Sequence, residues 1–288
     1  MRQFEGKAAI VTGAGSGLGL GLARTFARHG MSVVLCDIRG DRLEAALAEV
    51  RSLGGRAIAV VTDVSDRASV QAAAKVALNT FGALHVACNN AGVTIHGKSV
   101  AELSPQEWDW IIGVNLYGVI HGIETFLPLI RSHGDEGHIV NTASIAGFQV
   151  RGTRRSGAYA ATKFAVVALS ESLAHDLTDT PIGVSVLAPA AVKTRIYVSG
   201  ENRPARFGGP FEEPGNNPLQ KELESGGLAP DVVGERVVQA IRNRELYVFT
   251  HMEQKEWLMA RHQRIIDAYD ACERWIAEGA DTAAGHAG

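Results

Sequence analysis

Residues 8–19 read Ala8-Ala9-Ile10-Val11-Thr12-Gly13-Ala14-Gly15-Ser16-Gly17-Leu18-Gly19, an aliphatic run that leads directly into a glycine-rich turn. Apolar residues at helical spacing follow over residues 18–29, which is typical of a buried strand, a tight turn and a helix. Glycines let the backbone approach a pyrophosphate, whose charge is met by N–H groups at the helix N-terminus. We therefore predict a nucleotide-binding turn that comprises Thr12, Gly13, Ser16, Gly17, Leu18 and Gly19.

The alternation of strand and helix continues along the chain. Short apolar runs predict buried strands at residues 8–11, 32–36, 57–61, 84–88, 138–141, 183–187 and 246–250. Helical patterns lie among them, at residues 18–29, 41–53, 68–81 and 232–242. Regular alternation of this kind builds right-handed βαβ units with helices on both faces of a parallel sheet. The predicted fold class is α/β, a single Rossmann-type domain on a doubly wound, seven-stranded parallel sheet.

The pattern changes after Pro189. Five of the nine prolines fall between Arg195 and Asp231, which predicts an irregular substrate lid at residues 195–230 of a domain spanning residues 1–250. Apolar residues then recur at helical spacing, from Trp257 to Ile276, and predict a helical extension over residues 251–278. The small residues at 279–288 predict a disordered tail.

Composition excludes several classes of protein. The chain has 28 Lys+Arg and 31 Asp+Glu residues, so its net charge of -3 provides no basic surface for nucleic acid or anionic membranes. No apolar run is long enough to span a bilayer, and the N-terminus lacks the apolar stretch of a signal peptide. Three scattered cysteines and ten histidines without metal-ligand spacing predict neither disulfides nor a metal site. We expect a cytoplasmic protein with a small-molecule partner.

Asp37 ends the second predicted strand, 18 residues after Gly19, where an acid can accept hydrogen bonds from an adenosine ribose diol. A 2′-phosphate at that position would meet like charge. The alternatives are that Asp37 caps the next helix and that Arg39 reaches a phosphate. Because Ile38 follows the acid and the glycine turn contains no Lys or Arg, the sequence favours NAD over NADP.

Tyr159 and Lys163 place a phenol and an ammonium four residues apart, on one face of a predicted helix. A solvated Tyr/Lys face is the alternative interpretation. Ser144 follows the predicted strand at 138–141, and Asn89-Asn90-Ala91-Gly92 follows the strand at 84–88. Because open α/β sheets bind ligands at the carboxyl ends of their strands, we expect these polar groups to share one site.

With these motifs assembled, the sequence resembles the classical branch of the short-chain dehydrogenase/reductase family, from about Lys7 to Thr250. Residues 12–19 match the TGxxxGxG turn of that family, and residues 89–92 match its NNAG motif. The resemblance implies a catalytic tetrad of Asn115, Ser144, Tyr159 and Lys163. It also implies cofactor contacts from Ile38, Asp63, Val64, Asn90, Ala91, Gly92, Pro189, Val192 and Thr194, besides Asp37, Tyr159 and Lys163.

The mechanism that the resemblance implies is hydride transfer between an alcohol and NAD, with Tyr159 as acid/base. The Lys163 ammonium and the positive nicotinamide ring would lower the pKa of the phenol, and Lys163 would also bond the nicotinamide ribose. Ser144 would hold the substrate oxygen, and Asn115 would keep a water in the proton path. One departure is that 15 residues separate Ser144 from Tyr159 where 13 are usual, with residues 151–155 as an insertion in a substrate loop.

The lid resembles that of bacterial Cα-dehydrogenases of lignin β-aryl ethers. This resemblance implies that the substrate is a bulky hydrophobic secondary alcohol, and a benzylic alcohol is one interpretation. The alternatives are an NADPH-dependent 3-oxoacyl-thioester reductase and a nucleotide sensor without turnover. The family resemblance also implies a homotetramer or dimer, paired through the helices at residues 105–131 and 157–177. Trp108 and Trp110 are interpreted as core or subunit contacts rather than substrate contacts.

Overall fold

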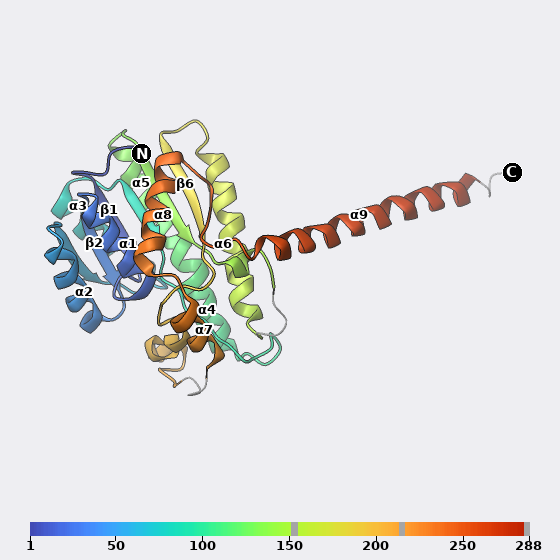
Figure 1. The fold of residues 1–288 in the computed structure, drawn as a ribbon, viewed down its shortest axis with the longest axis horizontal. Helices are drawn as coiled ribbons and strands as arrows, with labels where there is room; N and C mark the ends of the chain where they lie inside the picture. The colour runs from blue at the N-terminus through green and yellow to red at the C-terminus, as the bar shows by residue number, and fades with distance from the viewer. Residues whose placement is uncertain (151–154, 213–216, 285–288) are drawn as a thin grey trace. The chain divides into compact units, whose positions relative to one another are not determined.

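Seven parallel strands form one sheet in the order β3-β2-β1-β4-β5-β6-β7 (Figure 1). The computed structural model describes residues 1–150, 155–212 and 217–284 of the chain. The strands are β1 (Ala8–Thr12), β2 (Ser32–Asp37), β3 (Ala57–Val61), β4 (Val86–Asn89), β5 (Gly137–Thr142), β6 (Ile182–Ala188) and β7 (Tyr247–Phe249). The predicted seven-stranded, doubly wound α/β fold is confirmed. The strand order reverses between β1 and β4, which opens a crevice at their carboxyl ends.

Helices cover both faces of the sheet. One hydrophobic cluster packs α1 (Gly17–Arg28), α2 (Gly40–Ser52) and α8 (Pro230–Asn243) on one face. A second cluster packs α3 (Arg67–Phe81), α5 (Gly118–Ser132) and α6 (Gly157–Asp176) on the other. α1 and α8 lie side by side in front of the strands in Figure 1, and a Cβ at Gly21 would lie 2.5 Å from the Cβ of Pro230. Glycine at position 21 therefore lets α1 pack directly against the start of α8.

One long helical stretch contains a π-helical turn. α4 (Pro105–Ile112) starts with a capping box between Ser104 and Glu107, continues through η1 (Gly113–Tyr117) and joins α5. In η1 the Gly118 N–H donates to the Gly113 carbonyl five residues back, which widens the helix locally. The stretch from Pro105 to Ser132 is long and apolar enough to cross a membrane, but 61% of its most apolar part is buried inside the fold. We therefore assign it to the core of the domain.

The predicted lid contains more regular structure than its proline content suggested. It folds into η4 (Ile196–Asn202), η5 (Ala205–Phe207) and α7 (Pro218–Gly226), with residues 213–216 outside the described part. Pro218 and Pro230 open α7 and α8, at the helical position where proline costs no backbone hydrogen bond. Helix starts therefore account for two prolines that we had assigned to an irregular loop.

Contacts along the chain define two units, Met1–Thr250 and His251–Gly288. The second unit is α9 (Lys255–Ala284), a single helix. α9 continues beyond residue 278, so residues 279–284 are helical where a disordered tail was expected. Residues 285–288, and residues 151–154 of the predicted insertion, lie outside the described residues.

Candidate active site

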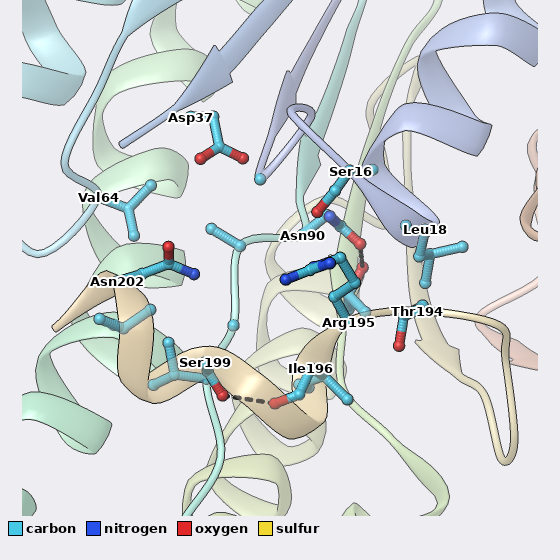
Figure 2. Close-up of a pocket in the computed structure, with 18 of the residues that line it drawn as sticks. Ser16, Leu18, Asp37, Val64, Asn90, Thr194, Arg195, Ile196, Ser199 and Asn202 are labelled. Carbon is cyan, nitrogen blue, oxygen red and sulfur yellow. Dashed lines mark hydrogen bonds between the residues drawn. The ribbon is translucent and has the colours of Figure 1, made fainter. Parts of the chain in front are cut away.

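The polar residues predicted from the sequence meet at the carboxyl edge of the sheet. They line a cleft with about 1290 Å³ of empty space, its open mouth included. Figure 2 shows Asp37 and Ser16 on one side of this cleft, with Ile196, Ser199 and Asn202 of η4 on the other. The predicted residues in its wall are Gly13, Ser16, Gly17, Leu18, Gly19, Asp37, Ile38, Asp63, Val64, Asn90, Ala91, Gly92, Ser144, Tyr159, Lys163, Pro189, Val192 and Thr194. Two predicted residues, Thr12 and Asn115, are not part of that wall.

The glycine turn fits a pyrophosphate. Gly13 has a positive φ of 67°, and a Cβ there would lie 2.9 Å from the Ala91 Cα. A Cβ at Gly19 would lie 2.1 Å from the Gly13 carbonyl oxygen, so only glycine lets α1 start this close to the turn. Ser16 precedes α1 in an extended conformation and makes no side-chain capping bond within the described chain. The first N–H groups of α1 are therefore available to an anion in the cleft.

Thr12 lies behind this turn and ties two strand ends together. Its Oγ1 accepts from the N–H groups of Asn90 at 2.9 Å and Ala91 at 3.1 Å, and donates to the Cys88 carbonyl at 3.3 Å. The Asn90 side chain donates in return to the Thr12 carbonyl at 2.9 Å. This exchange holds the loop after β4 against the loop after β1, where the crevice opens.

Asp37 points its carboxylate into the cleft. Its Oδ2 accepts from the Gly15 N–H at 2.9 Å, and its Oδ1 accepts from the Arg39 N–H at 3.0 Å. The residue preceding α2 is Arg39, so the alternative role of Asp37 as the cap of that helix is wrong. The carboxylate instead braces the glycine turn and faces the space where an adenosine ribose would lie.

Asp63 lies further along the same wall. Both of its carboxylate oxygens interact with other residues of the chain. Oδ1 accepts from the Ser65 N–H and hydroxyl, and Oδ2 forms an ion pair with Arg206 at 2.6 Å. Arg206 also donates to the Ser65 hydroxyl at 2.7 Å. The segment after η4 is therefore fastened to the loop after β3.

Tyr159 and Lys163 lie one turn apart on α6, with the Lys163 Nζ 5.6 Å from the centre of the phenol ring. Nζ donates to the Thr142 carbonyl at 2.8 Å, and the side chain is almost fully buried. Burial lowers the pKa of Lys163 to about 8. Burial raises the pKa of Tyr159, while a side-chain hydrogen bond with Ser144 acts in the opposite direction. In the protein chain alone, the phenol pKa is therefore raised and does not show the expected lowering by Lys163.

Asn115 sits in the π-helical turn η1 and is fully buried. Its Oδ1 accepts from the Val93 N–H at 2.8 Å, and its Nδ2 donates to the Val93 carbonyl at 2.9 Å and to Thr162 Oγ1 at 3.1 Å. The amide thus links the loop after β4 to the helix that carries Tyr159 and Lys163. In this structure Asn115 positions other groups of the site.

Several wall residues were not predicted from the sequence. Arg42 comes from α2, Trp110 from α4, and the segment around η4 adds a group consisting of Arg195, Ile196, Ser199 and Asn202. Trp110 is 1% exposed and packs edge-on against Phe211 at 6.0 Å, so it is a core residue that also lines the cleft. The lid was visible in the sequence as a proline-rich segment, but no local signal shows which of its side chains face the cleft.

One cluster of potential metal ligands lies outside the cleft: His85, His133 and Asp135. His85 Nδ1 accepts from the Ala8 N–H at 3.1 Å. His133 contacts the Leu84 carbonyl through Nε2 at 2.8 Å and accepts from the Asp135 N–H through Nδ1 at 3.1 Å. Both ring nitrogens of His133 thus contact backbone groups. We assign the cluster to hydrogen bonding at the strand ends.

Comparisons with known proteins agree with this geometry. The short chain dehydrogenase family matches residues 7–203. The C alpha-dehydrogenase of Sphingobium sp. is 35% identical over 271 residues, which cover 93% of this chain and 88% of the relative. The cyclohexanol dehydrogenase of Acinetobacter sp. is 37% identical over 199 residues, which cover 69% of this chain and 78% of the relative.

A solved short chain dehydrogenase/reductase from Burkholderia phymatum, in complex with NAD, superimposes with a TM-score of 0.87. It is 38% identical, and the match covers 92% of this chain and 96% of that one. Solved relatives hold either NAD or NADP. The glycine turn, the Asn90 loop and the Tyr159/Lys163 pair thus occur together in a chain that belongs to the short-chain dehydrogenase/reductase family.

Proposed function

We propose that this oxidoreductase uses NAD to interconvert a bulky hydrophobic secondary alcohol and its ketone. The observation that carries the proposal is the placement of Tyr159, Lys163 and Ser144 in one cleft with the glycine turn and Asp37. This arrangement joins a proton-transfer group to a dinucleotide site. Trp110, Ile196 and Leu223 give the cleft apolar walls, which suits a bulky hydrophobic substrate.

The residues present fit a dinucleotide. The uncapped N-terminus of α1 would hold the pyrophosphate, and Asp37 would accept hydrogen bonds from the adenosine ribose. Pro189, Val192 and Thr194 would border the nicotinamide end, with Lys163 bonding its ribose. When bound, the nicotinamide supplies the hydride acceptor or donor.

The phenol oxygen of Tyr159 is the group that moves the proton. With its pKa raised by burial, Tyr159 holds its proton at neutral pH and can donate it to a ketone oxygen during reduction. In alcohol oxidation it accepts the proton, which requires nearby positive charge to stabilise the phenolate. Lys163 is the cation on the adjacent turn. Ser144 orients the substrate oxygen toward the phenol, and Asn115 keeps the surrounding loop in place.

The name of the Sphingobium relative, a C alpha-dehydrogenase, supports a benzylic alcohol as the substrate. The test is to incubate the protein with NAD and a panel of 1-aryl alcohols, aryl ether dimers, hydroxysteroids, sugars and short aliphatic alcohols, following NADH. We expect turnover of bulky ring compounds. Oxidation of sugars or short alcohols alone would contradict the proposed substrate class.

We further propose a homotetramer or dimer in the cytoplasm, with α4, α5 and α6 at the subunit contacts. Tyr117, where η1 meets α5, is 51% exposed and would lie in that contact. Light scattering at micromolar concentration tests the assembly, and a monomer would contradict it.

A further inference from the structure

Glu201, at the end of η4, lies between two guanidinium groups. Its Oε2 is 2.7 Å from a terminal nitrogen of Arg42, and Arg195 lies 3.3 Å from Oε1. Arg42 belongs to the first turn of α2, so this contact joins the lid to the helix that follows Asp37. Arg42 and Arg195 both line the cleft, and Figure 2 shows Arg195 at its centre.

Arg42 and Asp37 flank the same point of the glycine turn. A Cβ built on Gly15 would lie 3.0 Å from the Asp37 carboxyl carbon and 3.1 Å from the Arg42 Cβ. An adenosine ribose that bonds Asp37 would therefore present its 2′ position near the Arg42 side chain. A guanidinium in that position would ordinarily attract a 2′-phosphate.

Arg39, the other cation beside Asp37, is already paired within its own segment. Its Nε and one terminal nitrogen contact the two oxygens of Asp41 at 2.8 and 2.6 Å. Its remaining terminal nitrogen faces the Asn202 side chain at 3.4 Å. Arg42 differs from Arg39 because the carboxylate that it contacts comes from the lid, 159 residues away in sequence.

We propose that Glu201 is a specificity-determining residue that acts against NADP from the lid. Its carboxylate pairs with Arg42, whose side chain lines the cleft near Asp37, and so occupies a guanidinium that could otherwise bind a 2′-phosphate. The 2′-phosphate of NADP therefore meets the Asp37 carboxylate and an occupied guanidinium, whereas NAD carries no 2′-phosphate to be repelled. The inference rests on the proposed preference for NAD and assigns part of that preference to a residue outside the Rossmann core.

The test compares cofactor selectivity in Glu201→Gln, which removes the charge and keeps the shape of the side chain. We expect kcat/KM for NADP to rise roughly three- to tenfold relative to that for NAD, because the pair is partly exposed and screened. Glu49→Gln is the matched control, because Glu49 pairs with Arg24 at the same 2.7 Å outside the cleft. Its selectivity ratio should not change.

A second variant separates charge from lid structure. Adding Arg42→Gln to Glu201→Gln should cancel most of the gain for NADP, since the freed guanidinium near Asp37 is then absent and only that of Arg195 remains. The binding of adenosine 2′-phosphate, compared with that of adenosine, gives the same comparison without turnover. Relative to adenosine, adenosine 2′-phosphate should bind more tightly to Glu201→Gln only. Equal losses with NAD and NADP would show that Glu201 merely supports the lid and would overturn the proposal.

The proposal and the underlying NAD preference can fail separately. If the unmodified protein prefers NADP, the cofactor assignment is wrong whatever Glu201 does. If the protein prefers NAD and Glu201→Gln leaves the selectivity ratio unchanged, the role of Glu201 is wrong and Asp37 alone sets the preference.

Discussion

The side-chain amide of Asn115 bonds both backbone groups of Val93, accepting from its N–H at 2.8 Å and donating to its carbonyl at 2.9 Å. An amide is matched to this task because it offers one acceptor and a donor in a fixed plane. The pair fixes the end of the loop that begins at Asn90. A Cβ at Gly92 in that loop would lie 3.5 Å from the Lys163 Nζ, so the loop borders the buried ammonium.

Replacing Asn115 with Ala should destabilise the fold, because two buried backbone groups of Val93 lose their partner. The expected loss in the free energy of unfolding is about 2–6 kcal/mol, from about one to three kcal/mol for each of the two unsatisfied groups. Urea denaturation measures it. Asn243→Ala, at an exposed hydrogen bond to Glu245, is the control and should have little effect. A loss no larger than that control would show that water replaces the amide.

Tyr159→Phe should reduce turnover about a thousandfold, in the range measured for a positioned general acid or base. The dissociation constant for NADH, from fluorescence titration, should stay nearly unchanged because the phenol mainly contacts substrate. Tyr269→Phe in α9 is the matched control for loss of a hydroxyl. Lys163→Ala should impair both turnover and NADH binding, and retention of most activity in Tyr159→Phe would mean that another group moves the proton.

The protein should use NAD at least tenfold better than NADP, a difference of about 1.4 kcal/mol. Asp37→Ser should narrow this gap by removing both the diol acceptor and the negative charge. The same change removes the acceptor of the Gly15 N–H, so some loss of activity with NAD is expected as well. Steady-state kinetics with both cofactors checks the prediction, and a gap that does not narrow would place the selectivity elsewhere.

Acid should destabilise the fold partly through His138. This side chain is fully buried, its Nε2 lies 2.8 Å from Ser185 Oγ, and burial lowers its pKa to about 3. The unfolded chain binds a proton at this histidine below pH 6.5, while the folded chain does so only near pH 3. Stability therefore falls as the pH drops from 6.5 towards 3, by about 1.4 kcal/mol per pH unit for one proton.

His138→Gln should flatten this dependence between pH 6.5 and 5, as measured by urea denaturation at several pH values. His262→Gln, in the exposed part of α9, is the control and should leave the slope unchanged. An unchanged slope in His138→Gln would mean that other groups take up the proton. His85, whose pKa burial lowers to about 4, contributes in the same direction.

The fold was predictable because its signals are local. Glycines in the turn after β1 and short aliphatic runs determine strand, turn and helix within a few residues of each other. The positions of Asp37 and Ser144 were also predictable, since parallel strands bring their carboxyl ends to one edge. Tyr159 and Lys163 were predictable as a pair from their four-residue spacing on one helix. The structure adds that Thr12 and Asn115 lie behind the cleft wall. Spacing along the chain cannot distinguish residues that line the cleft from residues that lie behind its wall.

The lid was less predictable because its contacts depend on the path of the chain in space. Arg42 and Glu201 lie far apart in sequence, and each alone has the character of a solvated surface charge. Pro218 and Pro230 open helices, but proline alone does not distinguish a helix start from an irregular loop. The raised pKa of Tyr159 in the protein chain alone could not be predicted from the sequence, because burial depends on tertiary packing.

The bonds of Arg206 to Asp63 and Ser65 have a consequence for protein engineering. A chimaera that takes residues 196–207 from another dehydrogenase, in order to change its substrate range, also replaces the fastening at the loop after β3. Under the proposed function, the exchange would therefore alter the substrate side of the cleft and the surroundings of Asp63 together. A transplanted lid therefore has to carry an arginine at position 206, or its recipient has to lose the acid at position 63.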